Sequence, residues 1–268
     1  MNYDGIKRLG IKNAAFDLDG TIITDNNRVI DGVLRGLESL KKNGITNFIV
    51  TGRGINLIKR QSFIRKFEPF IFPKLILNDG NIIYSLNSNK LYILNTINKN
   101  YVIGLYNYFK NKADFIIESR GIPFAQNRKS LMKYKMIYNI QTKIALFSNI
   151  TELENITKIY IFPQKGINRV IEDNMLNNNL FIVNKISFLN CYEIKPPFIS
   201  KDIGLEHLLR ICAMGNLNNV VSFGDGMNDK TLLNKSKLGI AVMNCEHSVS
   251  EICDVKLSVE IGEFLLSL

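Results

Sequence analysis

The sequence predicts an α/β fold, in which a parallel sheet with helices on both faces is interrupted by an inserted α+β segment. Short apolar runs alternate with helical stretches over residues 1–81 and again over residues 197–268. Strands that are apolar on both faces and alternate with helices are typical of a covered parallel sheet. Between these two parts the pattern changes to paired, hairpin-like runs. The 268 residues suffice for two domains with their own hydrophobic cores.

The first part of the chain contains five expected elements. The run KNAAFDL (12–18) predicts a strand, and DGVLRGLESLKKNG (31–44) predicts a helix, because its apolar residues recur at helical spacing and a glycine follows at the C-cap. The next elements are a strand in TNFIVTGR (46–53), a helical stretch over 55–67 and a strand in PKLILNDG (73–80).

The last part resumes the same alternation. We expect helices in DIGLEHLLRICAMG (202–215) and DKTLLNKS (229–236), and strands in NVVSFGDG (219–226) and LGIAV (238–242).

The middle of the chain is α+β in character. It contains an expected hairpin (82–94), a helix (101–111), a strand (158–163), a helix (166–176) and a second hairpin (180–194) that ends at two prolines. We therefore expect a discontinuous core formed by residues 1–81 and 197–268, with a cap domain over residues 82–196.

The net charge of +10 is concentrated in this middle segment, where residues 82–196 hold 15 Lys and Arg against 7 Asp and Glu. The densest basic cluster comprises Arg128, Lys129, Lys133 and Lys135, which either contacts an anionic substrate or forms a solvated face. No apolar run approaches the ~20 residues of a membrane span, and the N-terminus has no signal-peptide pattern, so we expect a cytoplasmic protein. Four scattered cysteines and two histidines do not favour a zinc site.

Polar residues follow every expected core strand. These positions are Asp17 and Asp19, then Thr51, Gly52 and Arg53, then Asn78, then Asp225, Asn228 and Asp229, and finally Asn244. In open parallel sheets the carboxyl ends of the strands lie along one edge, where ligands bind. The sequence therefore predicts one polar site made from five turns.

Four carboxylates in this site call for a cation. Residues i and i+2 of an extended strand share a face, so Asp17 and Asp19 are expected near Asp225 and Asp229. Like charges at 4 Å repel by about 4 kcal/mol at an effective dielectric constant of 20. Oxygen ligands suit Mg²⁺, which keeps positions for water and phosphate. Thr51, Gly52 and Lys201, at the start of an expected helix, could bind that phosphate.

These residues resemble the motifs of the haloacid dehalogenase-like (HAD) phosphatases, specifically the Cof-type subgroup with a type IIB cap. The first motif, D-x-D-G-T, matches residues 17–21, and the fourth, G-D-G-x-N-D, matches residues 224–229. Thr51 matches the second motif and Lys201 the third. The resemblance covers the core in the right order and implies a Rossmann-like sheet.

The resemblance also implies residue roles in an Mg²⁺-dependent phosphatase. Asp17 would be the nucleophile that becomes an aspartyl phosphate, and Asp19 the general acid and base. Mg²⁺ would be held by Asp17, the Asp19 backbone carbonyl and Asp225, with Asn228 and Asp229 orienting those ligands. Thr51, Gly52 and Lys201 would bind the phosphoryl group, and candidate substrate contacts are Arg53, Asn78 and Asn244.

The expected substrate is a small phosphorylated metabolite, such as a sugar phosphate or a phosphorylated cofactor. Two alternatives stay open: phosphomutase-like transfer through the same aspartates, and a non-catalytic nucleic-acid-binding module that uses the basic cap. We expect no membrane partner and do not favour a nucleic-acid partner, and the oligomeric state is open. The chain departs from the family pattern at Asp79, Lys230, Cys245 and Glu251, none of which is an expected catalytic or metal-binding residue.

Overall fold

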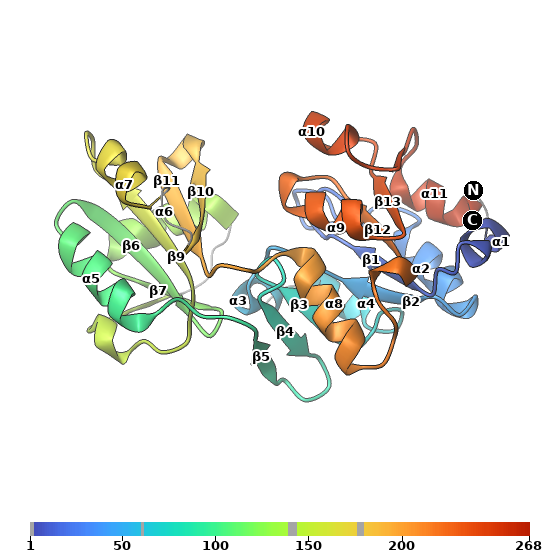
Figure 1. The fold of residues 1–268 in the computed structure, drawn as a ribbon, viewed down its shortest axis with the longest axis horizontal. Helices are drawn as coiled ribbons and strands as arrows, with labels where there is room; N and C mark the ends of the chain where they lie inside the picture. Colours follow the sequence, from blue (N-terminus) through green and yellow to red (C-terminus); the bar gives the residue numbers. More distant parts are fainter. Residues whose placement is uncertain (1–2, 60–61, 139–143, 176–179) are drawn as a thin grey trace. The chain divides into compact units, whose positions relative to one another are not determined.

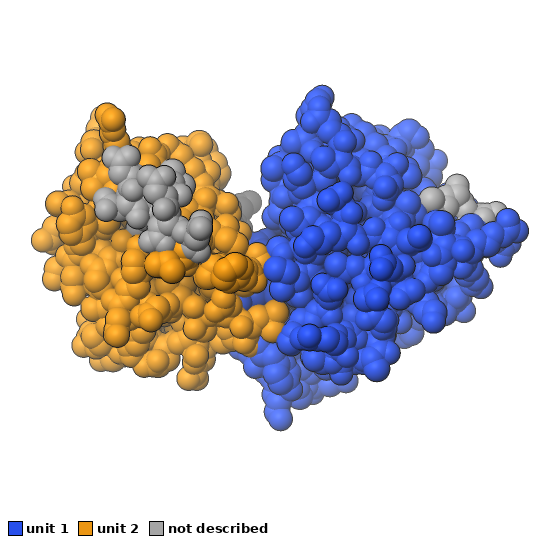
Figure 2. All heavy atoms as spheres, viewed as in Figure 1, with its two compact units in different colours: residues 1–92, 200–268 blue, residues 93–199 orange. Residues whose placement is uncertain are grey.

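The computed structural model describes residues 3–59, 62–138, 144–175 and 180–268 and divides the chain into two compact units. Unit 1 comprises residues 1–92 and 200–268, and unit 2 comprises residues 93–199 (Figure 2). Among the described residues, no helix combines the length and the apolar character needed to cross a membrane.

Unit 1 is built on a five-stranded parallel sheet in the order β14-β13-β12-β1-β2. Figure 1 labels β1, β2, β12 and β13 of this sheet. Its strands are β1 (Asn13–Phe16), β2 (Thr46–Ile49), β12 (Val220–Gly224), β13 (Leu238–Ala241) and β14 (Val255–Lys256). An isolated parallel bridge between Val50 and Ile76 joins it to a second sheet in the order β3-β4-β5, in which β3 and β4 are antiparallel. These strands are β3 (Lys74–Leu77), β4 (Ile82–Ser85) and β5 (Leu91–Ile93). The parallel sheet confirms the predicted α/β fold class.

Side chains of successive strand residues point to opposite sides of the sheet, and helices cover both of its faces. Ser222 donates a hydrogen bond to the carbonyl of Leu232 on α9 (Lys230–Lys235), at 3.4 Å, while the neighbouring Phe223 packs on Phe264 of α11 (Ile261–Ser267), with 6.2 Å between ring centroids. The helices of unit 1 are α1 (Tyr3–Arg8), α2 (Val33–Lys42), α3 (Ile55–Ile58), α4 (Ser62–Phe67), α8 (Lys201–Ile211), α9 (Lys230–Lys235), α10 (His247–Ser250) and α11 (Ile261–Ser267). The helical stretch expected over 55–67 is thus α3 and α4, and residues 60 and 61 between them lie outside the described part.

Unit 2 contains a six-stranded sheet in the order β10-β11-β9-β6-β7-β8. Its strands are β6 (Ala113–Ser119), β7 (Ile122–Ala125), β8 (Ala145–Leu146), β9 (Ile156–Pro163), β10 (Ile182–Ile186) and β11 (Cys191–Lys195). Helices α5 (Lys99–Phe109) and α7 (Asn168–Met175) pack on the face that carries Phe115 and Ile159, and α6 (Arg128–Tyr138) packs on the face that carries Ile116 and Tyr160. The helix predicted over 166–176 is α7, and its residue 176 is outside the described part.

The division between the units differs from the expected domain limits. The expected cap includes the hairpin at 82–94, but β4 pairs with β3 of unit 1, and the first division falls between residues 92 and 93 instead of after residue 81. The second falls after residue 199 instead of after residue 196. The hairpin itself forms as expected. Its pairing with β3 decides that it belongs to unit 1, and the local sequence pattern does not reveal this pairing.

The basic cluster of the middle segment is carried by α6, where it is partly neutralised. The ammonium nitrogens of Lys133 and Lys129 lie 3.0 Å and 3.5 Å from Asp114 Oδ2. Burial by itself raises the pKa of Asp114, but hydrogen bonds from Asn127 and Lys133 outweigh burial and lower this pKa. Two of the four basic residues are therefore paired within unit 2.

Candidate active site

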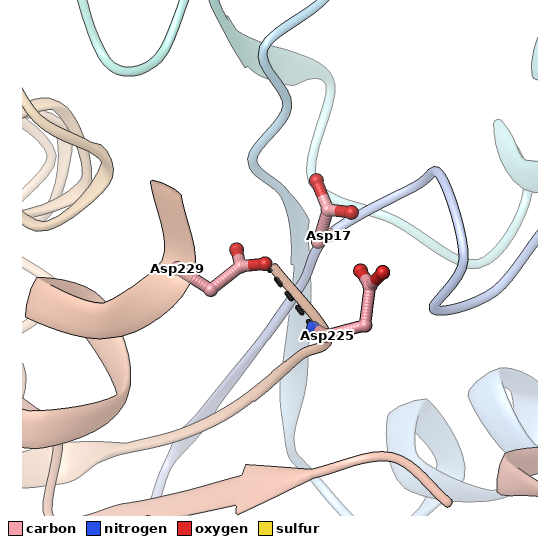
Figure 3. A group of neighbouring side chains, drawn as sticks. All are labelled: Asp17, Asp225 and Asp229. Carbon is pink, nitrogen blue, oxygen red and sulfur yellow. Dashed lines mark hydrogen bonds between the residues drawn. The ribbon is translucent and has the colours of Figure 1, made fainter. Parts of the chain in front are cut away.

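The carboxyl edge of the parallel sheet brings three carboxylates together. Oxygen atoms of Asp17, which follows β1, and of Asp225 and Asp229, which follow β12, all lie within 4.8 Å of one another (Figure 3). The parallel register of β1 and β12, with Phe16 opposite Phe223, places the two strand ends side by side. This arrangement matches the expected grouping of strand-end residues, with one exception.

That exception is Asp19, whose carboxylate is not in the group of three. Strand β1 ends at Phe16, and the chain then turns, with the amide of Thr21 donating to the carbonyl of Leu18 at 3.3 Å. The rule that residues i and i+2 share a face applies only to extended chain, so it fails here. The Asp19 carboxylate instead accepts two hydrogen bonds from Arg53.

A buried lysine bridges two of the three carboxylates. Lys201, the first residue of α8, is fully buried, and its ammonium donates to Asp17 Oδ1 at 2.5 Å and to Asp229 Oδ1 at 2.6 Å. Gly80 packs against the start of helix α8. Its φ is +97°, and a Cβ at this position would overlap the Ser200 carbonyl, so there is no room for a side chain. Backbone packing at the turn after β3 therefore sets the position of Lys201.

The three carboxylates have distinct surroundings. Asp229 Oδ2 accepts from the backbone amides of Asp225, at 3.2 Å, and Gly226, at 3.1 Å. Asp225 Oδ1 accepts from the hydroxyl of Thr21 at 3.0 Å. Asp229 thus has both oxygens engaged by donors and is suited to orienting the loop, whereas Asp17 and Asp225 keep more capacity to bind a cation.

Burial and mutual repulsion perturb the acidity of the group. Burial raises the pKa of Asp17 well above its usual value, Lys201 opposes the shift, and Asp229 and Asp225 add to it. Burial and then the charge of Asp229 raise the pKa of Asp225 to about 6. Burial by itself lowers the pKa of Lys201, but the charges of Asp17 and Asp229 outweigh burial and raise this pKa. One ammonium therefore does not balance the carboxylates, and a divalent cation bound by oxygen ligands fits the remaining charge.

The second strand end supplies a tight polar turn. Thr51 is fully buried, and its hydroxyl oxygen accepts from the Arg53 amide at 3.1 Å. Gly52 lies against the turn that follows β3, and a Cβ on Gly52 would be 2.8 Å from Asp79 Oδ1. Asp79 also accepts from Asn228 at 3.0 Å, so the turns after β2, β3 and β12 are joined.

The remaining candidate residues lie at the same edge but outside this group. Asn78 is buried, and its backbone amide donates to the Arg53 carbonyl at 3.0 Å. Asn244 is exposed in the turn after β13, and among the described residues no hydrogen bond joins its side chain to the carboxylates. Sequence reasoning did not single out Thr21 or Asn27 as site residues. Thr21 could have been found as the last residue of the D-x-D-G-T motif, while no sequence signal indicates Asn27.

Comparison with known proteins decides the family. The family model for haloacid dehalogenase-like hydrolases matches residues 14–259. The chain belongs to the haloacid dehalogenase-like hydrolases. This HAD-like chain is 25% identical over 237 residues to the HMP-PP phosphatase of Klebsiella pneumoniae, covering 87% of this chain and 84% of the relative. It is also 25% identical over 249 residues to a phosphoglycolate phosphatase of Methanopyrus kandleri, covering 92% and 90%.

Solved structures share the fold. A haloacid dehalogenase-like hydrolase from Bacteroides thetaiotaomicron superposes with a TM-score of 0.79 at 18% identity, covering 96% of this chain and 98% of that one. A structure described as a HAD subclass IIB sugar phosphatase superposes with a TM-score of 0.75 at 17% identity, covering 95% and 98%. The resemblance drawn from the motifs is confirmed. The HAD-like chain is an enzyme, and its family and the names of its relatives class it with the phosphoric monoester hydrolases.

Proposed function

We propose that this HAD-like phosphatase is Mg²⁺-dependent and hydrolyses a small phosphorylated metabolite through an aspartyl phosphate on Asp17. The observation that carries the proposal is the buried ammonium of Lys201 between Asp17 and Asp229, with Asp225 in the same group. A carboxylate held beside a fixed cation, at the edge of a sheet and next to metal-ligating oxygens, is suited to attack an anionic phosphoryl group.

In the first step an oxygen of Asp17 attacks phosphorus, and the bond from phosphorus to the leaving-group oxygen breaks. Asp19 gives its proton to that oxygen, which leaves as an alcohol. In the second step water attacks phosphorus, Asp19 takes the proton of the water, and phosphate leaves as the carboxylate of Asp17 is restored. Uncatalysed hydrolysis of phosphate monoesters is among the slowest known reactions, and a mechanism that combines covalent and acid–base catalysis suits the large rate enhancement that is needed.

The positively charged groups of the site would neutralise the phosphoryl oxygens. An ammonium has three N–H donors, and Lys201 gives two of them to carboxylates, so one is left for a phosphoryl oxygen. The Thr51 hydroxyl and the Gly52 amide would bind the other oxygens. Asp17, the Asp19 carbonyl and Asp225 would hold Mg²⁺, which supplies charge neutralisation when it is bound.

The substrate class follows from the family and from the names of the relatives. Relatives that are named HMP-PP phosphatase and phosphoglycolate phosphatase favour a small phosphorylated metabolite, and a phosphorylated sugar or cofactor is the class that we propose. Unit 2 would act as the cap that selects the leaving group. A cytoplasmic location stays a prediction.

The decisive test is phosphate release from a panel of phosphorylated metabolites, each with Mg²⁺ or with EDTA. We expect activity only with Mg²⁺, and its loss in Asp17→Asn. Borohydride reduction during turnover should convert Asp17 to homoserine, which mass spectrometry detects. Unchanged activity in Asp17→Asn would show the proposal to be wrong, whereas phosphoryl transfer to a second sugar without phosphate release would indicate a phosphomutase.

A further inference from the structure

The guanidinium of Arg53 is held from three sides within unit 1. Its Nε donates to Asp19 Oδ2 at 2.8 Å and its Nη2 to Asp19 Oδ1. Nη2 also donates to the side-chain oxygen of Asn27 at 2.6 Å, and the guanidinium carbon lies 5.4 Å from the ring centroid of Phe63 on α4. Arginine meets a carboxylate with such a two-pronged fork more rigidly than lysine can.

Within this pair, Arg53 is the fixed partner and Asp19 the one that it holds. The side chain of Arg53 is 12% exposed, against 49% for Asp19. The backbone of Arg53 is also bound at both ends, because its amide donates to the Thr51 hydroxyl and its carbonyl accepts from the Asn78 amide. Arg53 is therefore anchored in the turn that the proposed function assigns to phosphoryl binding.

Asn27 anchors the guanidinium from a separate turn. Its φ of +58° is in the left-handed region, which asparagine adopts more readily than most residues. The amide of Asn27 donates to the carbonyl of Thr24 at 2.8 Å, so the turn itself fixes its position. The segment between β1 and α2 thus contributes a residue to the site that follows β2.

Asp19 depends on these contacts for its orientation. The chain has left the strand at this residue, and its carboxylate is half exposed, so an unrestrained Asp19 would sample several rotamers. A general acid must lie within hydrogen-bond reach of the oxygen that it protonates. Two parallel hydrogen bonds from one guanidinium restrict both side-chain torsions of Asp19.

We propose that Arg53 is the positioning residue of the leaving-group step, orienting the Asp19 carboxyl toward the departing oxygen, and that Asn27 in turn orients Arg53. The proposal rests on the proposed function, in which Asp19 is the acid. It gives Arg53 a role distinct from the substrate contact expected from the sequence. Its consequence is that Arg53 matters most for substrates whose leaving group needs a proton.

The test compares benzyl phosphate with 4-nitrophenyl phosphate under Mg²⁺. Both carry one aromatic ring, but the benzyl alkoxide needs protonation to leave, whereas 4-nitrophenoxide is a stable anion. The measured quantity is kcat/KM, which covers the steps through departure of the leaving group. We expect Arg53→Met to raise the ratio of kcat/KM for 4-nitrophenyl phosphate over benzyl phosphate on the order of 10²-fold.

Two further variants separate positioning from charge. Arg53→Lys keeps the charge but has no fork, so its ratio should change nearly as much as in Arg53→Met. Asn27→Gly keeps access to the left-handed region while removing the amide, and should raise the ratio by a smaller factor. Far-UV circular dichroism checks that each variant is folded. Equal losses on both substrates would overturn the proposal, because they would mean phosphoryl binding or a structural role.

Asp19→Asn distinguishes failure of this proposal from failure of the proposed function. If Asp19→Asn leaves the ratio unchanged, the acid role itself is wrong. If it raises the ratio but the Arg53 variants do not, only the positioning role is wrong. When both roles hold, Arg53→Met adds no further change to the ratio in the Asp19→Asn background, because the two residues act as a unit.

Discussion

Replacing Lys201 by methionine should destabilise the protein more than any exposed lysine replacement does. Methionine has a similar length but no charge, so it leaves the carboxylates of Asp17 and Asp229 buried without their shared ammonium. At 2.5 and 2.6 Å and an effective dielectric constant of about 20, each contact contributes about 6.5 kcal/mol before desolvation. Burial of the ions offsets much of this, and removal of one partner of a buried pair costs about 3–5 kcal/mol.

The assay is urea unfolding in EDTA, followed by far-UV circular dichroism because the chain has no tryptophan. The matched control is Lys42→Met, since the Lys42 ammonium lies 2.7 Å from Glu38 Oε1 but its side chain is 72% exposed. Exposed pairs within a helix contribute about 0.3–0.5 kcal/mol. We expect the losses in unfolding free energy caused by the two substitutions to differ by several kcal/mol, although the ion pairs of Lys201 and Lys42 have nearly equal N···O distances.

The loss in Lys201→Met should shrink as the pH falls through the raised pKa of Asp17. The pKa of Asp17 is raised by burial, and Lys201 opposes that rise, so the variant raises it further. A carboxyl whose pKa is higher in the folded than in the unfolded state binds its proton more tightly when folded. The free energy of unfolding therefore increases as the pH falls through the folded pKa. A loss equal to that of Lys42→Met, or one that does not depend on pH, would refute this reasoning.

Three further predictions concern packing, metal binding and unit 2. Gly204→Ala should lower the thermal midpoint, because its Cβ would lie 2.5 Å from the Gly80 carbonyl, whereas Gly104→Ala, with no atom within 4 Å, should stabilise α5 by about 0.5–1 kcal/mol; a gain in both would contradict the packing. Asp225→Asn should abolish the rise in thermal midpoint that Mg²⁺ produces in the wild-type protein, and an undiminished rise would place the ion elsewhere. Asp114→Asn should cost stability at neutral pH. Burial by itself raises the pKa of Asp114, but its hydrogen bonds outweigh burial and lower that pKa on folding. The contribution of Asp114 to stability is therefore present above the unfolded pKa of about 3.9 and is lost as the pH falls through the folded pKa. A deficit in urea unfolding that does not shrink as the pH falls below about 3.9 would contradict the assignment.

The core of unit 1 could be predicted from the sequence because each strand is a short run that is apolar on both faces. Ala14, Ala15 and Phe16 are all fully buried, as such a run requires. The polar residues that follow each run were expected at one edge, and the group of Asp17, Asp225 and Asp229 lies there. The rule behind this prediction is general, since the carboxyl ends of parallel strands share an edge.

Unit 2 was less predictable. Strands β6 and β7 and helix α6 have no expected counterpart, and they belong to a sheet whose order departs from chain order. Strand β9 lies between β6 and β11, although 36 residues separate the end of β6 from its start. Such pairings depend on contacts between residues that are far apart in the sequence. The local spacing of apolar residues carries no information about these contacts.

By itself the sequence determined the alternation of strands and helices, the motif residues and the edge of the sheet at which they meet, because each depends on spacing along the chain. Only the tertiary structure decided how the two aspartates of the first motif differ. Asp17 faces Lys201, which is 184 positions away, and Asp19 faces Arg53, which is 34 positions away. The backbone turn after β1 separates the two side chains, and the packing of other strand ends supplies a different cation to each. Those partners come from the first residue of α8 and from the turn after β2, which the fold brings to the aspartates from distant parts of the chain and which no local pattern encodes.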